Sequence, residues 1–127
     1  MKVYVAGNNQ QISNKIANTL RASGFTIVSS WLNEKKFNTK THTKKEKQAI
    51  AHRDYNEVCK CDMLILISSP HYVPGGKFVE TGIALGRRKK VIVIGHIENM
   101  LLWNVNIMQF NTIEQFIESY YRNKEIK

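Results

Sequence analysis

The 127-residue sequence predicts an α/β fold built on a parallel β-sheet. Two short segments, 63–67 and 91–94, are wholly apolar, which is typical of strands buried on both faces of a sheet. Segments with the helical spacing of apolar residues alternate with such strands along the chain. Because parallel strands are joined by crossover connections, which are usually helices, this alternation indicates a parallel sheet with helices on both faces.

The predicted strands and helices follow one another in a regular order. We expect strands over 3–6, 25–29, 63–67, 91–94 and 106–110, and helices over 12–23, 45–60, about 77–88 and from 113 onward. The first helix is predicted from the four-residue spacing of Ile12, Ile16 and Leu20. Before the last helix, Asn111 and Glu114 have the spacing of a capping box.

Five strands in a chain of this length fit a flavodoxin-like, doubly wound sheet of order 2-1-3-4-5. We therefore treat residues 1–127 as a single domain. In such sheets, ligands bind beyond the carboxyl ends of the strands. The predicted loops at that edge are 7–11, 68–77 and 95–105, so we expect the functional residues to lie there.

The formal net charge of +9 resides in two runs of basic residues. Segment 35–47 has six lysines and one glutamate (+5), segment 87–90 has four basic residues (+4), and the rest of the chain sums to zero. We interpret 87–90 as the positive cap of a helix end. Segment 35–47 has no aromatic residue after Phe37 to stack on bases, so we do not expect this segment to bind nucleic acid.

The cysteines and the lengths of the apolar runs indicate the cellular compartment in which the protein is expected. Cys59 and Cys61 are two residues apart, too close for an easy disulfide in regular structure and too few for a metal site. No apolar stretch reaches the roughly 18 residues of a membrane span, and the N-terminal apolar run is too short for a signal peptide. We therefore expect reduced thiols, a cytoplasmic location, no membrane association and no metal.

Two carboxylates are candidates for catalysis. Asp54 shares a helical stripe with Ile50 and Val58, on a face where an acid is costly unless it is hydrogen-bonded or functional. The alternative is that Asp54 simply pairs with a nearby Lys or Arg. Glu80 is expected near the first turn of the helix over 77–88, where the positive helix end favours an ionised carboxylate. Such a carboxylate suits a nucleophile, although Glu is common in first turns for structural reasons alone.

Two further features could contact a ligand. The run Gly75, Gly76 and Lys77 could hold an anion through backbone N–H groups, but it matches neither the phosphate loop nor G-x-G-x-x-G. NAD and ATP therefore have no motif in this sequence. Trp31, just after the second predicted strand, could stack on a base or pack into the core.

Together, these segments resemble the short form of the nucleoside 2-deoxyribosyltransferase family. The matching segments are 4–7 (YVAG), Arg53-Asp54 with Asp62 eight residues after Asp54, 75–86 (GGKFVETGIALG), and 93–95 followed by Glu98-Asn99. The resemblance covers nearly the whole chain in order. Its most specific part is the E-x-G-x-A-L stretch at 80–85.

The resemblance implies a flavodoxin-like enzyme without a cofactor that acts on nucleosides or nucleotides and free nucleobases. It implies that Glu80 attacks C1′ of the deoxyribose, and that a second base or water resolves the covalent intermediate. It also implies that Asp54 orients the nucleophile and the sugar. Asn99 matches a position that reaches the sugar 5′ end in a neighbouring subunit, which implies a homodimer or larger homo-oligomer.

The remaining residues of the resemblance are expected to bind the substrate. This set contains Tyr4, Gly7, Asn8, Trp31, Ser68, Gly75, Gly76, Lys77 and Asn99. Candidates by position for the acid that protonates the leaving base are His71, Tyr72 and Asp62, although Asp62 fits better as a cap at the start of the third strand.

The sequence departs from the family pattern at two places. Many members carry an acid six residues before the nucleophile, where this chain has Pro74. A hydrolytic branch, the 2′-deoxynucleoside 5′-monophosphate N-glycosidases, holds phosphate with Ser and Arg after the first strand, where residues 8–10 are Asn, Asn and Gln. Lys77 and the serines at 68–69 could hold phosphate instead. The sequence leaves open transfer to a base, hydrolysis, and a non-catalytic nucleotide-binding module.

Overall fold

The computed structural model describes residues 1–35, 42–69 and 75–126. Within these residues, one sheet is built from five strands, β1 (Lys2–Ala6), β2 (Thr26–Ile27), β3 (Met63–Ile67), β4 (Lys90–Ile94) and β5 (Ile107–Phe110). The order is β2-β1-β3-β4-β5, and every pairing of neighbouring strands is parallel. The predicted α/β class, the five strands and their order are therefore confirmed.

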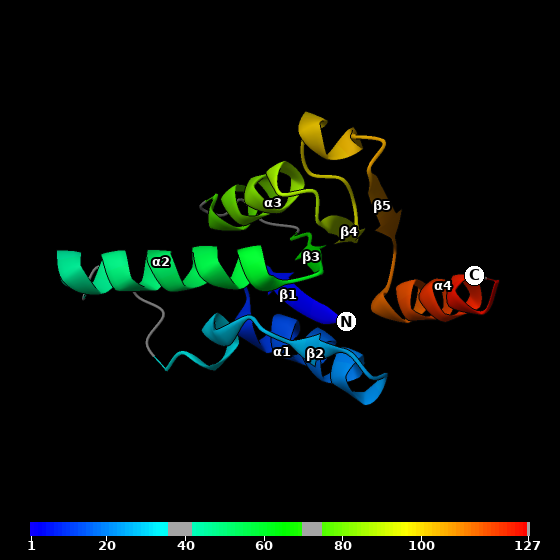
Figure 1. Cartoon of the computed structure of the whole chain (residues 1–127), viewed down its shortest axis with the longest axis horizontal. Coiled ribbons are helices and arrows are strands. Elements are labelled where there is room, and N and C mark those ends of the chain that lie inside the picture. The colour runs from blue at the N-terminus through cyan, green and yellow to red at the C-terminus, as the bar shows by residue number, and fades with distance from the viewer. Residues whose placement is uncertain (36–41, 70–74, 127) are drawn as a thin grey trace.

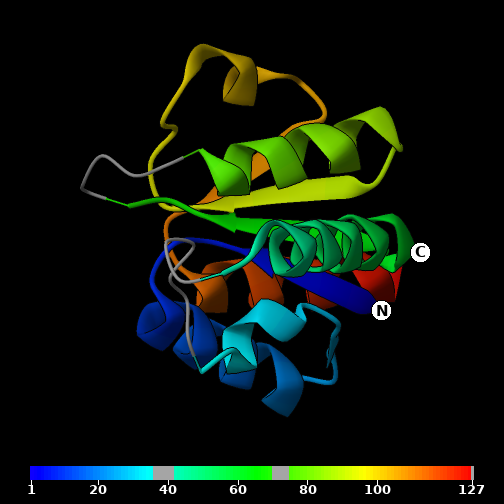
Figure 2. The same cartoon turned by 90° about the vertical axis from the view of Figure 1, so that its left-hand side faces the viewer.

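Helices cover both faces of the sheet. They are α1 (Gln10–Ala22), α2 (Lys44–Lys60), α3 (Gly76–Gly86) and α4 (Ile113–Ile126), with 3-10 turns η1 (Ser30–Asn33) and η2 (Met100–Trp103). Figure 1 shows α2 and α3 on one face of the sheet and α1 and α4 on the other, and Figure 2 shows the same layers after a quarter turn. In the described part of the chain, no helix is both long and apolar enough to cross a membrane.

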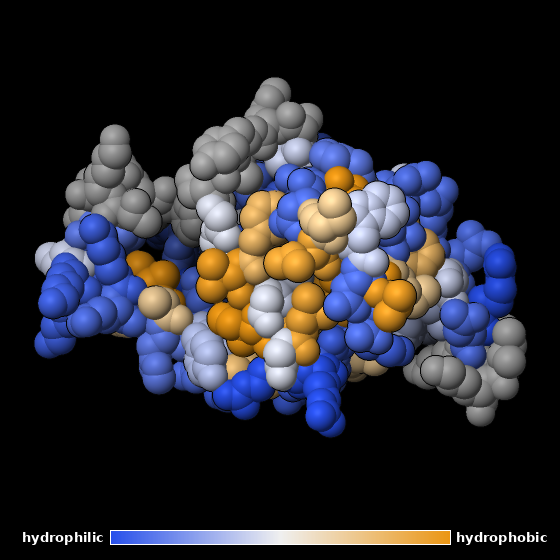
Figure 3. All heavy atoms as spheres, turned by 90° about the horizontal axis from the view of Figure 1, so that it is seen from above, coloured by the Kyte–Doolittle hydropathy of each residue, from blue (hydrophilic) through white to orange (hydrophobic). Residues whose placement is uncertain are grey.

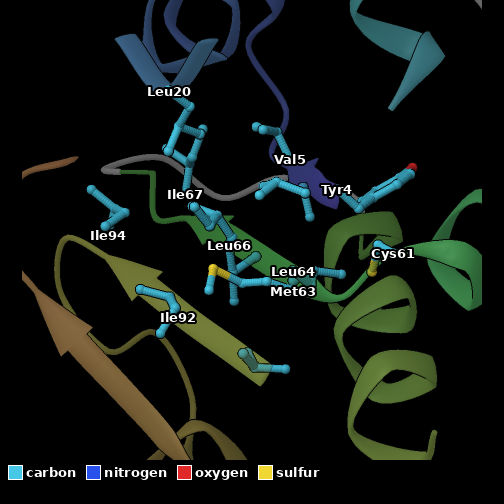
Figure 4. Close-up of a cluster of buried hydrophobic side chains, with 14 of the residues drawn as sticks. Tyr4, Val5, Leu20, Cys61, Met63, Leu64, Leu66, Ile67, Ile92 and Ile94 are labelled. Carbon is cyan, nitrogen blue, oxygen red and sulfur yellow. The ribbon is translucent and has the colours of Figure 1, made fainter. Parts of the chain in front are cut away.

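The core lies in and around the central strands β1, β3 and β4. All five residues of β3 are buried, as are four of the five in β1 and in β4. Figure 4 shows side chains from these strands extending to both sides, toward Leu20 of α1 on one side and Cys61 on the other. Burying one such side chain contributes about 1.5–3 kcal/mol. The two-sided burial predicted from the continuous apolar runs is confirmed, and both cysteines are free thiols.

The second strand is shorter than predicted, because only Thr26 and Ile27 form it. The Val28 N–H still donates to the carbonyl of Val3 at 2.9 Å. One residue later, the Ser29 hydroxyl accepts from the Val5 N–H at 3.0 Å. A side chain thus takes the place of a backbone carbonyl, and the ladder ends there.

Two helix details also differ from the prediction. In α1, the inward face is formed by Ser13, Ala17 and Leu20, whereas Ile12 is 50% exposed. The buried face of α1 is therefore shifted from the predicted Ile12 position to Ser13. In α4, the cap is Thr112, whose hydroxyl accepts from the Gln115 N–H at 3.2 Å. The predicted Asn111–Glu114 capping box was therefore one residue too early.

The turn after β4 depends on Gly95, which has a φ of 105°. A Cβ at this position would lie 1.9 Å from Ser68 Oγ and 3.2 Å from Ser68 Cβ. The loops after β3 and β4 therefore meet without room for a side chain. By contrast, Gly82 in α3 is exposed and has no atom within 4 Å of an added Cβ.

We expect Gly95→Ala to lower the free energy of unfolding by about 2 kcal/mol, because the variant combines a clash with a left-handed backbone. Gly82→Ala should raise it by about 0.5–1 kcal/mol, because alanine is the better helix former. Urea denaturation at pH 7 measures both. Equal stability of the two variants would contradict this account of the turn.

Candidate active site

The carboxylate of Glu80 is hydrogen-bonded to the hydroxyl of Tyr4, which donates to Glu80 Oε2. Tyr4 lies in the middle of β1 and is fully buried. Glu80 lies on α3, beyond the first helical turn, which contains no acidic residue. The sheet and the helix together therefore hold this carboxylate from two sides.

The protonation of Glu80 differs from the sequence-based expectation. Burial raises the pKa of Glu80 to about 7. The hydrogen bond from Tyr4 opposes this rise, and the charges of Asp54 and Glu57 add to it. Burial, followed by the charge of Glu80, also raises the pKa of Tyr4 far above its ordinary value. The expectation that the helix end keeps Glu80 ionised was wrong, because Glu80 lies past that end and burial dominates.

Asp54 is half-buried on α2 and is held by its neighbour Arg53. Arg53 donates to Asp54 Oδ1 from Nη2 at 2.8 Å and from Nε at 3.1 Å. Burial raises the pKa of Asp54, whereas the Arg53 guanidinium lowers it. The pairing of Asp54 with an arginine is therefore confirmed, and Asp54 lies one turn before buried Val58. The catalytic role of Asp54 stays a prediction.

Two further carboxylates accompany this pair. Glu34, just after η1, forms an ion pair with Arg53. Glu57, one turn after Asp54 on α2, accepts from the Ser30 hydroxyl at 2.6 Å and from the Ser30 N–H at 3.0 Å. We call Glu34, Asp54, Glu57 and Glu80 the carboxyl cluster. Sequence reasoning missed Glu34 and Glu57, although Glu57 has the spacing that places it near Asp54 on a helix face.

Lys77, at the start of α3, is engaged inside the protein. Its fully buried ammonium donates to Glu98 Oε1 at 2.6 Å and to the Ile67 carbonyl at 3.1 Å. Glu98 also accepts from the Ser69 N–H at 3.1 Å. This ion pair joins the start of α3 to the loops that follow β3 and β4. The lysine proposed from the sequence as an anion ligand is therefore committed to an internal contact.

The comparisons with known proteins bear on this geometry. The family model for nucleoside 2-deoxyribosyltransferase matches residues 2–115. The chain belongs to this family. It is therefore an enzyme of the class that transfers deoxyribosyl groups or cleaves N-glycosidic bonds, and its partners include nucleosides and nucleobases. A search of curated proteins finds no match.

Two solved structures share the fold of this family member. A 2-deoxyribosyltransferase of Bacillus psychrosaccharolyticus is 21% identical with a TM-score of 0.75, and the match covers 92% of this chain and 90% of that chain. A CMP N-glycosidase of Clostridium botulinum is 15% identical with a TM-score of 0.62, and the match covers 94% of this chain and 98% of that chain. At these identities, both matches support the flavodoxin-like fold.

Several residues that the family resemblance assigns to substrate binding have structural contacts. Trp31 is only 3% exposed, and its indole N–H donates to the Val5 carbonyl at 2.7 Å, as the core-packing alternative predicts. The Ser68 hydroxyl donates to the Ile94 carbonyl at 3.1 Å. Gly7 allows a close approach, because a Cβ there would lie 2.8 Å from Ser13 Oγ. These contacts explain the residues without a ligand.

Other predicted ligand residues remain accessible. Gly75 and Gly76 are exposed, and Gly75 is the N-cap residue of α3. Asn8 is half-buried in the loop after β1. Asn99 is exposed, and its side chain accepts from the Leu101 N–H at 3.1 Å at the start of η2.

The candidates for the acid that protonates the leaving base are only partly located. His71 and Tyr72, like Pro74, lie outside the described residues. Asp62 lies at the amino end of β3, where it accepts from the Lys2 N–H at 2.8 Å, as its predicted capping role requires. It is thus at the edge of the sheet opposite the expected site. Among the described residues, no group of three or more His, Cys, Asp or Glu could hold a metal ion.

The raised pKa of Glu80 makes the stability of the fold depend on pH. Between the ordinary pKa of 4.5 and about 7, the folded protein keeps a proton that the unfolded chain releases. The free energy of unfolding therefore falls as pH rises through this window. Glu80→Gln should gain about 3 kcal/mol over the wild type between pH 4.5 and pH 8.

Chemical denaturation at several pH values measures this difference. Glu118→Gln, which changes an exposed glutamate on α4, serves as the control and should show no such pH-dependent gain. A constant difference between Glu80→Gln and the wild type across this range would refute the assigned pKa.

Proposed function

We propose that the protein cleaves the N-glycosidic bond of 2′-deoxynucleosides through a covalent glycosyl-Glu80 intermediate and transfers the deoxyribosyl group to another base. The observation that carries this proposal is the placement of Glu80. Its carboxylate is half-buried, hydrogen-bonded to Tyr4 and raised in pKa by the charge of a second half-buried acid, Asp54, in a chain of this family.

The proposed reaction has two steps. In the first, ionised Glu80 attacks C1′, and the C1′–N bond breaks with its electron pair leaving on the base, which takes up a proton. In the second, a nitrogen of an acceptor base attacks C1′, the ester bond to Glu80 breaks, and the acceptor releases a proton. Water in place of the acceptor base would give hydrolysis. This is the retaining arrangement of glycoside chemistry, in which a carboxylate nucleophile works with proton delivery to the leaving group.

The assigned roles follow from the contacts. The Tyr4 hydroxyl fixes one oxygen of Glu80 and favours its ionised form, because the hydrogen bond lowers the pKa that burial raises. Asp54, fixed by Arg53, orients the nucleophile and the sugar. Gly75, Gly76 and Asn8 remain proposed substrate contacts, as they lie in loops at the carboxyl edge of the sheet.

One other reaction is compatible with the family. It is hydrolysis of deoxynucleoside 5′-monophosphates, a reaction similar to that named for the CMP N-glycosidase of similar fold. The engagement of Lys77 with Glu98 and of Ser68 with Ile94 favours the nucleoside over the phosphorylated substrate. The non-catalytic nucleotide-binding module that the sequence left open does not agree with membership of this enzyme family.

A homodimer or larger homo-oligomer is part of the proposal. Figure 3 shows apolar side chains gathered on the face over α3 and η2. The exposed apolar residues of these elements and the loop that follows are Val79, Met100, Leu101, Trp103 and Val105. Leu101 is 81% and Trp103 70% exposed, which is unusual for a monomer surface. Asn99, adjoining this patch, would be carried toward a second copy.

Glu80→Ala should lower base exchange by about 10³-fold or more, because the nucleophile is lost. Exchange is measured with 2′-deoxynucleosides and a free acceptor base, and Glu118→Ala on α4 is the matched control. Undiminished exchange in Glu80→Ala would eliminate the covalent mechanism.

The wild type is also assayed with and without acceptor, on ribonucleosides and on 5′-monophosphates, which separates transfer from hydrolysis.

The pH dependence of kcat/KM should have an acidic limb near the Glu80 pKa of about 7, rising with pH because the nucleophile must lose its proton. Tyr4→Phe should move this limb to higher pH, because the hydrogen bond that lowers the pKa of Glu80 is removed. Tyr55→Phe, at an exposed tyrosine on α2, should leave the limb in place. If the acidic limb of the Tyr4→Phe variant stays at the wild-type pH, the hydrogen bond from Tyr4 does not lower the pKa of Glu80.

Leu101→Asp should reduce the molar mass measured by light scattering to that of the monomer, because an unpaired charge would be buried between copies. Ile12→Asp places the same charge at a half-exposed apolar position on α1 and should leave the assembly intact. A monomeric wild type, or identical behaviour of the two variants, would rule out this interface.

A further inference from the structure

Six basic side chains gather at the edge of the sheet opposite the loops that carry the expected site. They are Lys2, Lys60, Arg87, Arg88, Lys89 and Lys90, and we call them the basic edge. They stand at the start of β1, the end of α2, the end of α3 and the start of β4. In Figure 2 the N terminus and the carboxyl ends of α2 and α3 lie on one side of the molecule.

The sheet register brings these residues together. Val3 of β1 pairs with Met63 of β3, and Met63 pairs with Lys90 of β4. Because neighbouring strands lie about 4.8 Å apart, the starts of β1 and β4 are about 10 Å apart. This distance spans about three steps of one nucleic-acid strand at about 3.4 Å each. These cations lie in three separate segments of the sequence, whereas the fold brings them to one edge of the sheet.

The positive charge of this surface is largely uncompensated. Among described residues 1–2, 59–62 and 86–90, the one acidic side chain is Asp62, which accepts from the Lys2 backbone. In the part of the chain that the structure describes, no ion pair involves any of the six. The carboxyl ends of α2 and α3 offset about half a charge each. Strand starts have no such dipole, so the lysines of β1 and β4 are not explained as helix caps.

The backbone of Arg88 supplies a second, independent observation. Its φ is 59°, and no other non-glycine residue among those described has a positive φ. It closes α3 in the position where glycine is usual, with Lys89 N–H donating to the Ala84 carbonyl at 2.9 Å. An arginine there costs conformational free energy that glycine would avoid. Left-handed non-glycine residues are uncommon, and they cluster at functional positions.

We propose that the basic edge binds the phosphate backbone of nucleic acid without reading its bases. Lysine and arginine side chains at this density match closely spaced phosphates, and the arginine fork suits phosphate oxygens. An anionic membrane fits less well, because surface helices that bind membranes add apolar side chains beside the charges. Here the most exposed large apolar residues lie in α3 and in the segment from η2 to β5. This proposal does not depend on the proposed reaction.

The first experiment measures binding of a fluorescein-labelled 20-nucleotide single strand by anisotropy at several salt concentrations. With about five phosphate contacts, log K should fall with log salt with a slope of about −3.5. The triple variant Lys2→Gln, Arg88→Gln and Lys90→Gln should reduce the slope by about 2 and weaken binding at least tenfold at low salt. The matched control, Lys44→Gln, Lys45→Gln and Lys47→Gln, removes the same charge from the start of α2 and should weaken binding less than threefold.

Three results would overturn the proposal. They are no binding at low salt, equal losses in the two triple variants, and tighter capture of polyglutamate or phosphatidylserine vesicles than of the oligonucleotide. Base exchange by the triple variant should equal that of the wild type, because the basic edge lies away from Glu80, and this confirms that the variant is folded.

The single variant Arg88→Gly separates binding from a capping role. Glycine relieves the left-handed backbone, so Tm should rise by a few degrees. Oligonucleotide binding should nevertheless weaken severalfold. A higher Tm with unchanged binding would show that Arg88 is only a helix cap and would count against the basic edge.

Discussion

The parallel pairing of β1 with β3, buried on both faces, is the constraint on which the rest of the structure depends. It aligns Val3 with Met63 through Ala6 with Leu66, so that the carboxyl ends of both strands emerge at one edge of the sheet. Parallel strands need crossovers, and these place α2 and α3 over one face. Tyr4 can meet Glu80 only because β1 lies beneath this helix layer.

The site is arranged at a cost to stability. Two carboxyl groups, Glu34 and Asp54, pair with the Arg53 guanidinium. Burial raises the pKa of Asp54 and of Glu80, and the charges of Asp54 and Glu57 raise that of Glu80 further. Each buried acid that must ionise opposes folding at neutral pH. The apolar strands β3 and β4 and the internal Lys77–Glu98 pair hold the surrounding loops in place. Such a division, with a costly site on a strongly packed sheet, is common in enzymes.

Charge is distributed unevenly over the molecule. The acids of the carboxyl cluster lie just after η1, on α2 and on α3, whereas the basic residues at the start of β1 and β4 lie at the opposite edge of the sheet. The net charge of +9 therefore says little about the environment of the reacting groups. Its significance depends on which segments the sheet brings side by side.

The sequence by itself determined the α/β class, the order of the five strands, the family and the two acids on which the proposal rests. Continuous apolar runs and helical spacing are local patterns in the sequence. They predict the fold correctly because the residues that form these patterns are the ones that the folded protein buries. The end of β2 and the cap at Thr112 were not predictable. The first depends on a hydrogen bond to another strand, and the second on a choice between neighbouring polar residues.

Only the tertiary structure decided what surrounds each predicted residue. It placed Trp31 in the core, paired Lys77 with Glu98, added Glu34 and Glu57 to the site, and gave Glu80 a pKa near 7 instead of a low one. The physical reason is that desolvation and hydrogen bonding are set by neighbours remote in sequence, such as Tyr4, which lies 76 positions from Glu80. Residue type indicates which chemistry is available, and the fold determines the protonation and the contacts under which it operates.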